Sequence, residues 1–143
     1  MRFPPAHRIG WRAIWGIIVP TDRTDTILLV ENEPLIAMDL EEMLHSSGFE
    51  PVDHVVSCAN ALAWLDRSAA RLVILDLIVS DGATTPVAER LMATGTPFIV
   101  YSGYGRHEAP GDGAFDAAIW LSKPCRQSDL ALAVRQALGL PFR

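Results

Sequence analysis

The stretch ILLVENEPLIAMDL, residues 27–40, joins a short apolar run to an acidic turn and then to a segment with helical periodicity. The apolar run is typical of a strand, which we predict at 26–30. Pro34 suits an early position of a helix, and the pattern predicts that helix over 34–47. The chain therefore enters its fold as a strand, a polar turn and a helix.

The same alternation of short apolar runs and amphipathic segments continues to the end of the chain. The run LVIL at 72–75 has no polar residue, as expected for a strand that is covered on both faces. Further strands are predicted at 51–57, 71–76, 96–102 and 117–122, and further helices at 59–68, 85–94, 105–112 and 126–138. Pro110 and three glycines interrupt the helical pattern of the segment around 105–112. Five strands alternating with five helices indicate an α/β fold with a doubly wound parallel sheet.

Composition narrows the class of protein. A chain of 143 residues fits one domain, and its net charge of -5 argues against nucleic acid as a direct partner. No apolar run approaches the roughly 20 residues that span a bilayer, so we expect a soluble, cytoplasmic protein with no membrane partner. Cys58 and Cys125 lie far apart and lack C-x-x-C spacing, which predicts two reduced thiols and neither zinc nor a disulfide.

The first 25 residues differ from the rest. They contain four arginines and two aspartates, a net charge of +2. Their apolar stretch is short and leads to no small-residue cleavage site, so a signal peptide is not expected. We predict an N-terminal extension of uncertain structure at 1–25, followed by the domain at 26–143. Its apolar side chains, among them Trp11 and Ile14, are expected to pack against the domain or against a second subunit in a homodimer.

Polar side chains follow four of the five predicted strands. Glu31 and Asn32 follow the first strand, Asp76 the third, Ser102 the fourth and Lys123 the fifth. In doubly wound sheets the functional site lies outside the carboxyl ends of the strands, so these side chains are expected to converge. Each alone could be turn chemistry, but their occurrence at four strand ends favours a site. The lysine is the only one in the chain, which hints at a need for a compact ammonium.

These strand ends carry the motifs of a known family. They read VENEP, VILDLIVSDG, IVYSGYG and LSKP. With an acidic pair, an aspartate, a hydroxyl and a Lys-Pro pair in this order, the chain resembles bacterial two-component response-regulator receiver domains over about residues 26–139. The resemblance implies a flavodoxin-like sheet with strand order 2-1-3-4-5. The YSGYG stretch also resembles a subgroup with ATGY at this position, from which Tyr101 and Ser102 depart.

The resemblance implies that Asp76 accepts a phosphoryl group from a sensor histidine kinase or a histidine phosphotransfer protein. Mg²⁺ would be held by Glu31, Asn32, Asp76 and the backbone carbonyl of Ile78, and Lys123 would pair with the phosphoryl group. A carboxylate nucleophile needs such positive charges because the phosphoryl oxygens repel it. The chain would then be a signalling domain and not an enzyme, at most catalysing its own phosphoryl transfer and dephosphorylation.

The resemblance also implies a switch. Ser102 would bind a phosphoryl oxygen after modification, and Trp120 stands where the family usually carries Tyr or Phe that turns inward. The alternative is that Trp120 is only a large residue on an edge strand. The face formed by the fourth helix, fifth strand and fifth helix would bind a downstream protein partner. Nothing in the chain resembles an effector domain, so a stand-alone receiver is expected.

Two other functions stay open. Asn32 lacks the negative charge of a second acidic residue, so the chain could be a receiver-like interaction module with weakened or lost Mg²⁺-dependent phosphorylation; Ser102 and Trp120 are further minority choices. Asn32 could also be an N-cap of the helix, and its amide oxygen can still ligate a hard cation. An enzyme on the related fold is disfavoured, because the chain has no glycine-rich phosphate loop, no G-x-S-x-G motif and no histidine at a predicted strand end.

Overall fold

Five parallel strands form the central sheet. The computed structural model describes residues 10–14, 17–21, 25–110 and 113–141, with side chains from residue 25 onward. The strands are β3 (Ile27–Val30), β4 (Val52–Val55), β5 (Leu72–Leu75), β8 (Phe98–Ser102) and β9 (Ile119–Ser122). Their order is β4-β3-β5-β8-β9, and all neighbours are parallel. The predicted order 2-1-3-4-5 of a flavodoxin-like sheet is therefore confirmed.

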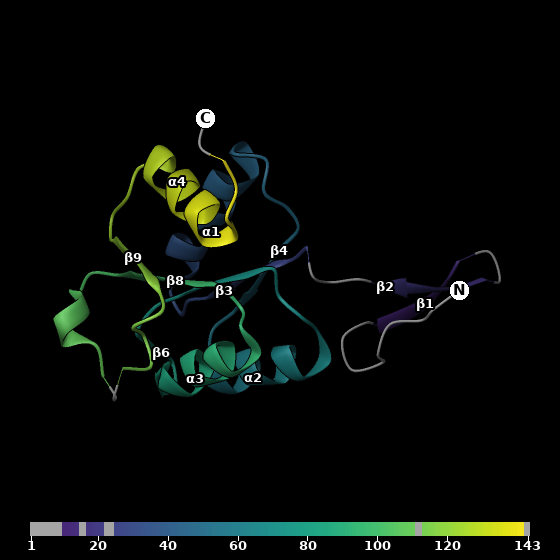
Figure 1. Ribbon diagram of the computed structural model, residues 1–143, viewed down its shortest axis with the longest axis horizontal. Helices are drawn as coiled ribbons and strands as arrows, with labels where there is room; N and C mark the ends of the chain where they lie inside the picture. The colour runs from purple at the N-terminus through teal and green to yellow at the C-terminus, as the bar shows by residue number, and fades with distance from the viewer. Residues whose placement is uncertain (1–9, 15–16, 22–24, 111–112, 142–143) are drawn as a thin grey trace.

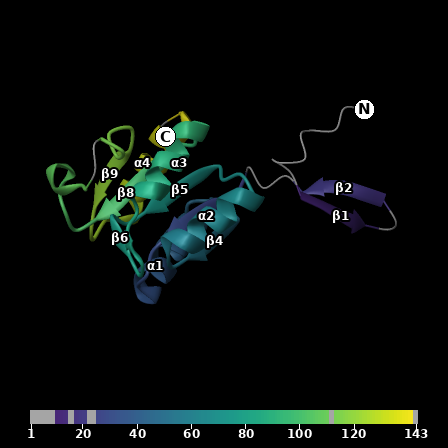
Figure 2. The ribbon, with the colours of Figure 1, turned by 90° about the horizontal axis from the view of Figure 1, so that it is seen from below.

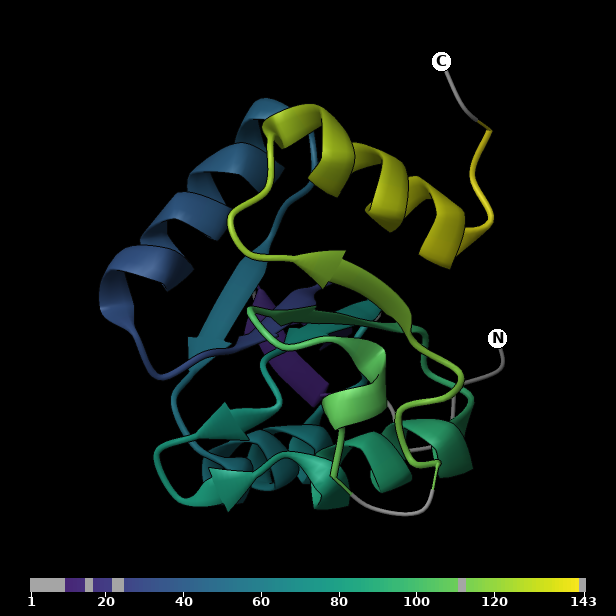
Figure 3. The same cartoon turned by 90° about the vertical axis from the view of Figure 1, so that its left-hand side faces the viewer.

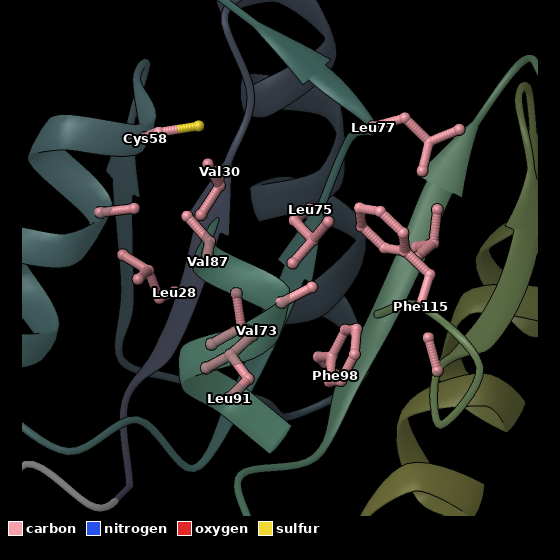
Figure 4. Packing of buried hydrophobic residues seen from close by; sticks show 14 of the residues in the cluster. Leu28, Val30, Cys58, Val73, Leu75, Leu77, Val87, Leu91, Phe98 and Phe115 are labelled. Carbon is pink, nitrogen blue, oxygen red and sulfur yellow. The ribbon is translucent and has the colours of Figure 1, made fainter. Parts of the chain in front are cut away.

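Two helices cover each face of the sheet (Figure 1). One face carries α1 (Pro34–Ser46) and α4 (Gln127–Leu138), and the other carries α2 (Cys58–Arg67) and α3 (Thr85–Thr94). Successive side chains of a strand point to opposite faces, so each strand contributes to two cores. Figure 4 shows the core beneath α2 and α3, where Leu28, Val73 and Leu75 meet Val87 and Leu91.

Burial on both faces explains the continuous apolar runs of the central strands. Every residue of β3 and β5 is at most 1% exposed. A single polar residue in either run would place an unsatisfied group in one of the two cores, so the chain can carry polar side chains only where these strands end. The fold thereby concentrates its chemistry at the carboxyl edge of the sheet.

The start of α1 differs from the prediction in one detail. Glu33, and not Asn32, occupies the N-cap position, and its side chain makes no capping hydrogen bond, so the interpretation of Asn32 as the N-cap is wrong. Pro34 stands in the first turn, as predicted. Gly48 follows the helix with φ 87°, a left-handed conformation that favours glycine.

The predicted fourth helix is wrong. The structure has only the 3-10 turn η1 (Arg106–Glu108) there, and the chain returns to β9 through further turns (Figure 3, green). Pro110 lacks a backbone donor for helix continuation. Residues 111–112 lie outside the described residues. The expected output face therefore consists of η1, β9 and α4 in place of a fourth and a fifth α-helix.

Two antiparallel hairpins were not predicted. The first is β1 (Gly10–Ile14) with β2 (Ile17–Thr21) in the N-terminal extension, and Figures 1 and 2 both show it apart from the five-stranded sheet. The side chains of this hairpin, including those expected to be buried, lie outside the described residues. The second, β6 (Ile78–Val79) with β7 (Gly82–Ala83), follows the third strand of the sheet.

Candidate phosphoacceptor site

Lys123 joins the carboxyl ends of β3 and β5. Its Nζ lies 3.0 Å from Oε1 of Glu31 and 2.8 Å from Oδ2 of Asp76. The backbone N–H of Lys123 donates to the carbonyl of Ser102 at 3.0 Å, and the Lys123–Pro124 peptide bond is cis. Four of the predicted site residues are thus brought together from three strand ends and the turn after β9.

Glu31 is the most buried acidic group of the site. The residue is 3% exposed, and Oε2 has no hydrogen-bond partner among the described residues. Burial, with a further contribution from the neighbouring Asp76, raises the pKa of Glu31 above its usual range, although the contact with Lys123 acts in the opposite direction. A buried carboxylate oxygen without a donor costs free energy, so this atom marks a place where a cation would be stabilised.

Lys123 remains an ammonium in this setting. Burial alone would lower the pKa of Lys123, but the hydrogen bonds and charges of Asp76 and Glu31 together raise it. One positive charge is therefore shared between two carboxyl groups. When both are ionised the cluster keeps a negative charge, which a divalent cation can neutralise.

Asp76 is held through both its side chain and its backbone. Oδ1 accepts a hydrogen bond from the Leu77 N–H at 2.7 Å, and the Asp76 carbonyl accepts one from Oγ1 of Thr84 at 2.6 Å. The same hydroxyl lies 3.2 Å from the Leu77 carbonyl, and Thr84 is fully buried. Sequence reasoning missed Thr84; its place just before Thr85-Pro86 at a helix start was the only available indication.

The β6–β7 hairpin does not use the carbonyl of Ile78 in its ladder. The Thr84 N–H donates to the Leu77 carbonyl at 2.8 Å, so these two residues form a hydrogen-bonded pair. Ile78 and Ala83 are the next pair of the ladder. Pairs alternate in an antiparallel ladder, so the Ile78 carbonyl points away from β7.

The oxygen atoms of this site are of the chemical type that Mg²⁺ binds. The candidates are carboxylate oxygens of Glu31 and Asp76, the amide oxygen of Asn32 and the carbonyl of Ile78, and hard cations prefer such ligands. Within the part of the chain that the structure describes, no three His, Cys, Asp or Glu side chains lie close enough to hold a metal. A cation would therefore depend on the amide and the backbone as well as on two carboxylates.

Ser102 and Trp120 lie on neighbouring strands. Ser102 is 1% exposed and its Oγ accepts a hydrogen bond from the Tyr104 N–H at 3.1 Å. Trp120 pairs with Val100, two positions before Ser102 in the register of β8 with β9. The Trp120 indole is half-buried against the core beneath α2 and α3, and its Nε1 has no hydrogen-bond partner among the described residues.

Arg106 holds the loop that covers Trp120. Its guanidinium lies 5.5 Å from the centre of the indole, and its Nη2 donates to the Ala118 carbonyl at 3.2 Å. A longer contact of 3.4 Å joins its Nη1 to the Asp116 carbonyl. The indole is thus confined between the core and a cation that the loop supplies.

The profile of the response regulator receiver domain matches residues 27–135. The chain belongs to the response regulator receiver family. Receiver domains are signalling domains and generally not enzymes. None of the helices in the described ranges is long and apolar enough to cross a membrane.

Two curated regulators are similar to this receiver. The phyllosphere-induced regulator PhyR of Methylorubrum extorquens is 27% identical over 126 residues, which cover 86% of this chain and 47% of that protein. The transcriptional regulatory protein PdtaR of Mycobacterium tuberculosis is 31% identical over 119 residues, which cover 79% of this chain and 56% of that protein. The chain spans about half the length of these relatives.

Solved structures of other receiver domains superpose on this chain. SdrG of Sphingomonas melonis Fr1 is 37% identical with a TM-score of 0.68, over 80% of this chain and 96% of that one. The receiver domain of the sensor histidine kinase PA1611 of Pseudomonas aeruginosa PAO1 shares the fold, with 22% identity, a TM-score of 0.68 and coverage of 80% and 97%. That structure has magnesium coordinated in its active site cleft, and receivers in general bind Mg²⁺ there.

Proposed function

We propose that this receiver accepts a phosphoryl group on Asp76 from a sensor histidine kinase or a histidine phosphotransfer protein. The observation that carries the proposal is the Lys123 ammonium, 2.8 Å from the Asp76 carboxylate and 3.0 Å from that of Glu31. An ammonium at this distance from the nucleophile is where charge on a transferring phosphoryl group would be neutralised.

The chemistry follows from these contacts. A carboxylate oxygen of Asp76 attacks phosphorus, the bond from phosphorus to the donor imidazole nitrogen breaks, and the electron pair of that bond stays on the imidazole. The Leu77 N–H and the Thr84 hydroxyl fix the side chain and the backbone of Asp76 during transfer. Lys123 can move from the carboxylate to a phosphoryl oxygen without leaving the site.

The proposed cofactor is Mg²⁺, held by Glu31, Asn32, Asp76 and the Ile78 carbonyl. When bound, the ion would neutralise charge on the carboxylates and the phosphoryl oxygens. The unpartnered Oε2 of Glu31 supports this assignment, because it is a buried acceptor that lacks a donor in the described residues. Asn32 adds no charge, so the affinity is expected to be low.

The proposed output is a protein-protein contact. Ser102 would bind the new phosphoryl group, and Trp120 on the next strand would respond. The face of η1, β9 and α4 would then bind a downstream partner or a second copy of the chain. We place both the phosphorylation and this binding in the cytoplasm. Phosphorylation adds about -1.5 to -2 units of charge, enough to bias two conformations that differ by a few kcal/mol.

A second candidate is a receiver that acts by binding alone. The observation in its favour is Asn32, which leaves two carboxylates at the site, both already paired with Lys123. Such a protein would use the same output face without modification. The two candidates differ in whether Asp76 gains mass.

Mass spectrometry after incubation with acetyl phosphate and Mg²⁺ separates them. We expect the mass of one phosphoryl group on the wild-type chain and on the control Asp116→Asn, which changes an exposed aspartate, and none on Asp76→Asn. Chelation of Mg²⁺ should abolish the gain. A wild-type chain that stays unmodified with acetyl phosphate and with a panel of kinases would contradict phosphotransfer and favour binding alone.

A further inference from the structure

The tip of the β6–β7 hairpin is fastened to the beginning of α2. Asp81 accepts hydrogen bonds from the backbone N–H groups of Cys58 at 2.7 Å and Ala59 at 3.0 Å, one on each carboxylate oxygen. Ser80 donates to the Val56 carbonyl from Oγ at 2.8 Å and from its backbone N–H at 3.2 Å. The Cys58 thiol donates to the Ala83 carbonyl at 3.2 Å.

These contacts exceed what α2 needs for capping. The helix has its own N-cap, Ser57, whose Oγ accepts from the Asn60 N–H at 3.0 Å. Asp81 binds the first two N–H groups of the helix from a segment 22 to 23 positions along the chain. These backbone hydrogen bonds lower the pKa of Asp81, so the group is held as a carboxylate at the positive end of the helix dipole.

The hairpin links this anchor to the phosphoacceptor. Asp76 stands at its base, where Thr84 binds the backbone, and Asp81 stands at its tip. Ile78 lies between them and is 54% exposed, so its side chain contributes little to fixing the backbone. The position of the Ile78 carbonyl therefore depends on the neighbouring residues and on the two ends of the hairpin.

We propose that Asp81 is a positioning residue for the metal site. By fastening the hairpin to α2 it holds the Ile78 carbonyl where the cation binds, although Asp81 touches neither the cation nor the phosphoryl group. This inference rests on the proposed function, because it requires that the site binds Mg²⁺. The proposal adds Asp81 to the residues on which the site depends. Asp81 lies five positions beyond Asp76 and acts through its contact with α2.

Calorimetric titration of the metal-free protein with MgCl₂ tests the proposal with three variants. Asp81→Ala removes both acceptors and should weaken Mg²⁺ binding roughly tenfold, the lower range for loss of a group that orients a metal ligand. Asp81→Asn keeps one acceptor oxygen and should weaken Mg²⁺ binding less than Asp81→Ala does. Ser57→Ala is the matched control: it removes a cap from the same helix and should lower thermal stability with an unchanged Mg²⁺ Kd.

Amide hydrogen exchange supplies a readout that needs no metal. In Asp81→Ala, the amides of Cys58, Ala59 and the hairpin should lose protection while those of β3 and β5 keep it. Three results would overturn the proposal: an Asp81→Ala Kd within twofold of wild type, equal losses in Asp81→Ala and Asp81→Asn, or the same loss in Ser57→Ala. A wild-type protein that binds no Mg²⁺ would instead remove the metal from the proposed function, and this inference with it.

Discussion

Thr84 carries a buried hydroxyl that contacts the backbone of Asp76. It is fully buried and donates to the Asp76 carbonyl at 2.6 Å, with the Leu77 carbonyl at 3.2 Å. Thr84→Val keeps the shape and leaves buried acceptors without this donor, so the free energy of unfolding should fall by about 1–3 kcal/mol. Urea denaturation measures the change.

The control for this prediction is Thr94→Val. The Thr94 hydroxyl is exposed on α3 and donates to the carbonyl of Arg90 within its own helix at 3.0 Å. Its loss should change stability by less than about 0.5 kcal/mol, as for most surface substitutions. Equal effects of the two substitutions would show that the buried hydroxyl does not stabilise the loop after β5.

The proposed function predicts that the residue at position 32 affects how tightly the site binds a cation. Asn32→Asp adds one negative charge beside Glu31, and we expect Mg²⁺ to bind about three- to tenfold more tightly, as for a unit charge interaction of about 1 kcal/mol in a well-solvated turn. Asn60→Asp, which adds the same charge at an exposed position of α2, is the control. If calorimetry gives the same Kd for both variants, Asn32 is not a ligand.

The site residues differ in how far sequence could predict them. Glu31, Asp76, Ser102 and Lys123 follow strands, and parallel strands bring their carboxyl ends to one edge, so order along the chain is enough. Thr84 and Asp81 were missed. Their contacts join segments 8 and 22 to 23 positions apart, and no local pattern distinguishes such a hydroxyl or carboxylate from turn chemistry.

At the scale of elements, η1 replaces a helix and Arg106 holds it in place. Arg106→Ala removes two hydrogen bonds to the carbonyls of Asp116 and Ala118 and the contact with Trp120. We expect the free energy of unfolding to fall by about 0.5–1.5 kcal/mol, since exposed cation-π contacts and net hydrogen bonds are each of this size. Thermal denaturation followed by circular dichroism measures it.

Arg126→Ala is the comparison for Arg106. Its side chain is 88% exposed, and its nearest ion pair, with Asp129, is 3.9 Å long. Such pairs contribute little, so stability should change by at most about 0.5 kcal/mol. If both arginine variants unfold at the wild-type temperature, the loop does not depend on the Arg106 contacts.

Periodicity predicted the long elements and missed the short ones. The strands β3 and β5 and the helices α1 to α4 each have an apolar pattern, because burial on one or both faces imposes it. The two-residue strands β6 and β7 are too short to show a period. The segment at 105–110 has helix-forming residues but no apolar face, and among these described residues Gly105 and Pro110 flank the short 3-10 turn η1.

For the whole molecule, the buried thiol of Cys58 predicts a loss of stability in alkali. Burial is the main cause that raises the pKa of Cys58 from 9.0 to about 11, and the negative charge of Asp81 raises it further. The unfolded chain releases this proton near pH 9 while the folded chain keeps it, so stability is complete below pH 9 and falls as pH rises towards 11. The slope from one such group is about 1.4 kcal/mol per pH unit.

Denaturation of wild type and Cys58→Ala between pH 8 and 11 checks this. The variant should be less stable at neutral pH because it loses a buried thiol. Its free energy of unfolding should fall less steeply with pH over that window, by the contribution of about one titrating proton. Burial also raises the pKa of Tyr101 to about 12, which adds a common decline above pH 10 in both proteins. Parallel curves from pH 9 onward would show that the thiol does not contribute.

The solitary lysine turns the site into its own covalent reporter. Lys123 supplies the only side-chain amine of the chain, and it is 17% exposed between two carboxylates. A stable amide that an acylating reagent forms on a side-chain amine therefore marks this one atom, so the labelled fraction of molecules counts the sites that have opened. Amine reagents that label many lysines in other proteins would here label one side chain, which peptide mapping separates from the α-amino group, and its extent would report whether the ammonium is engaged.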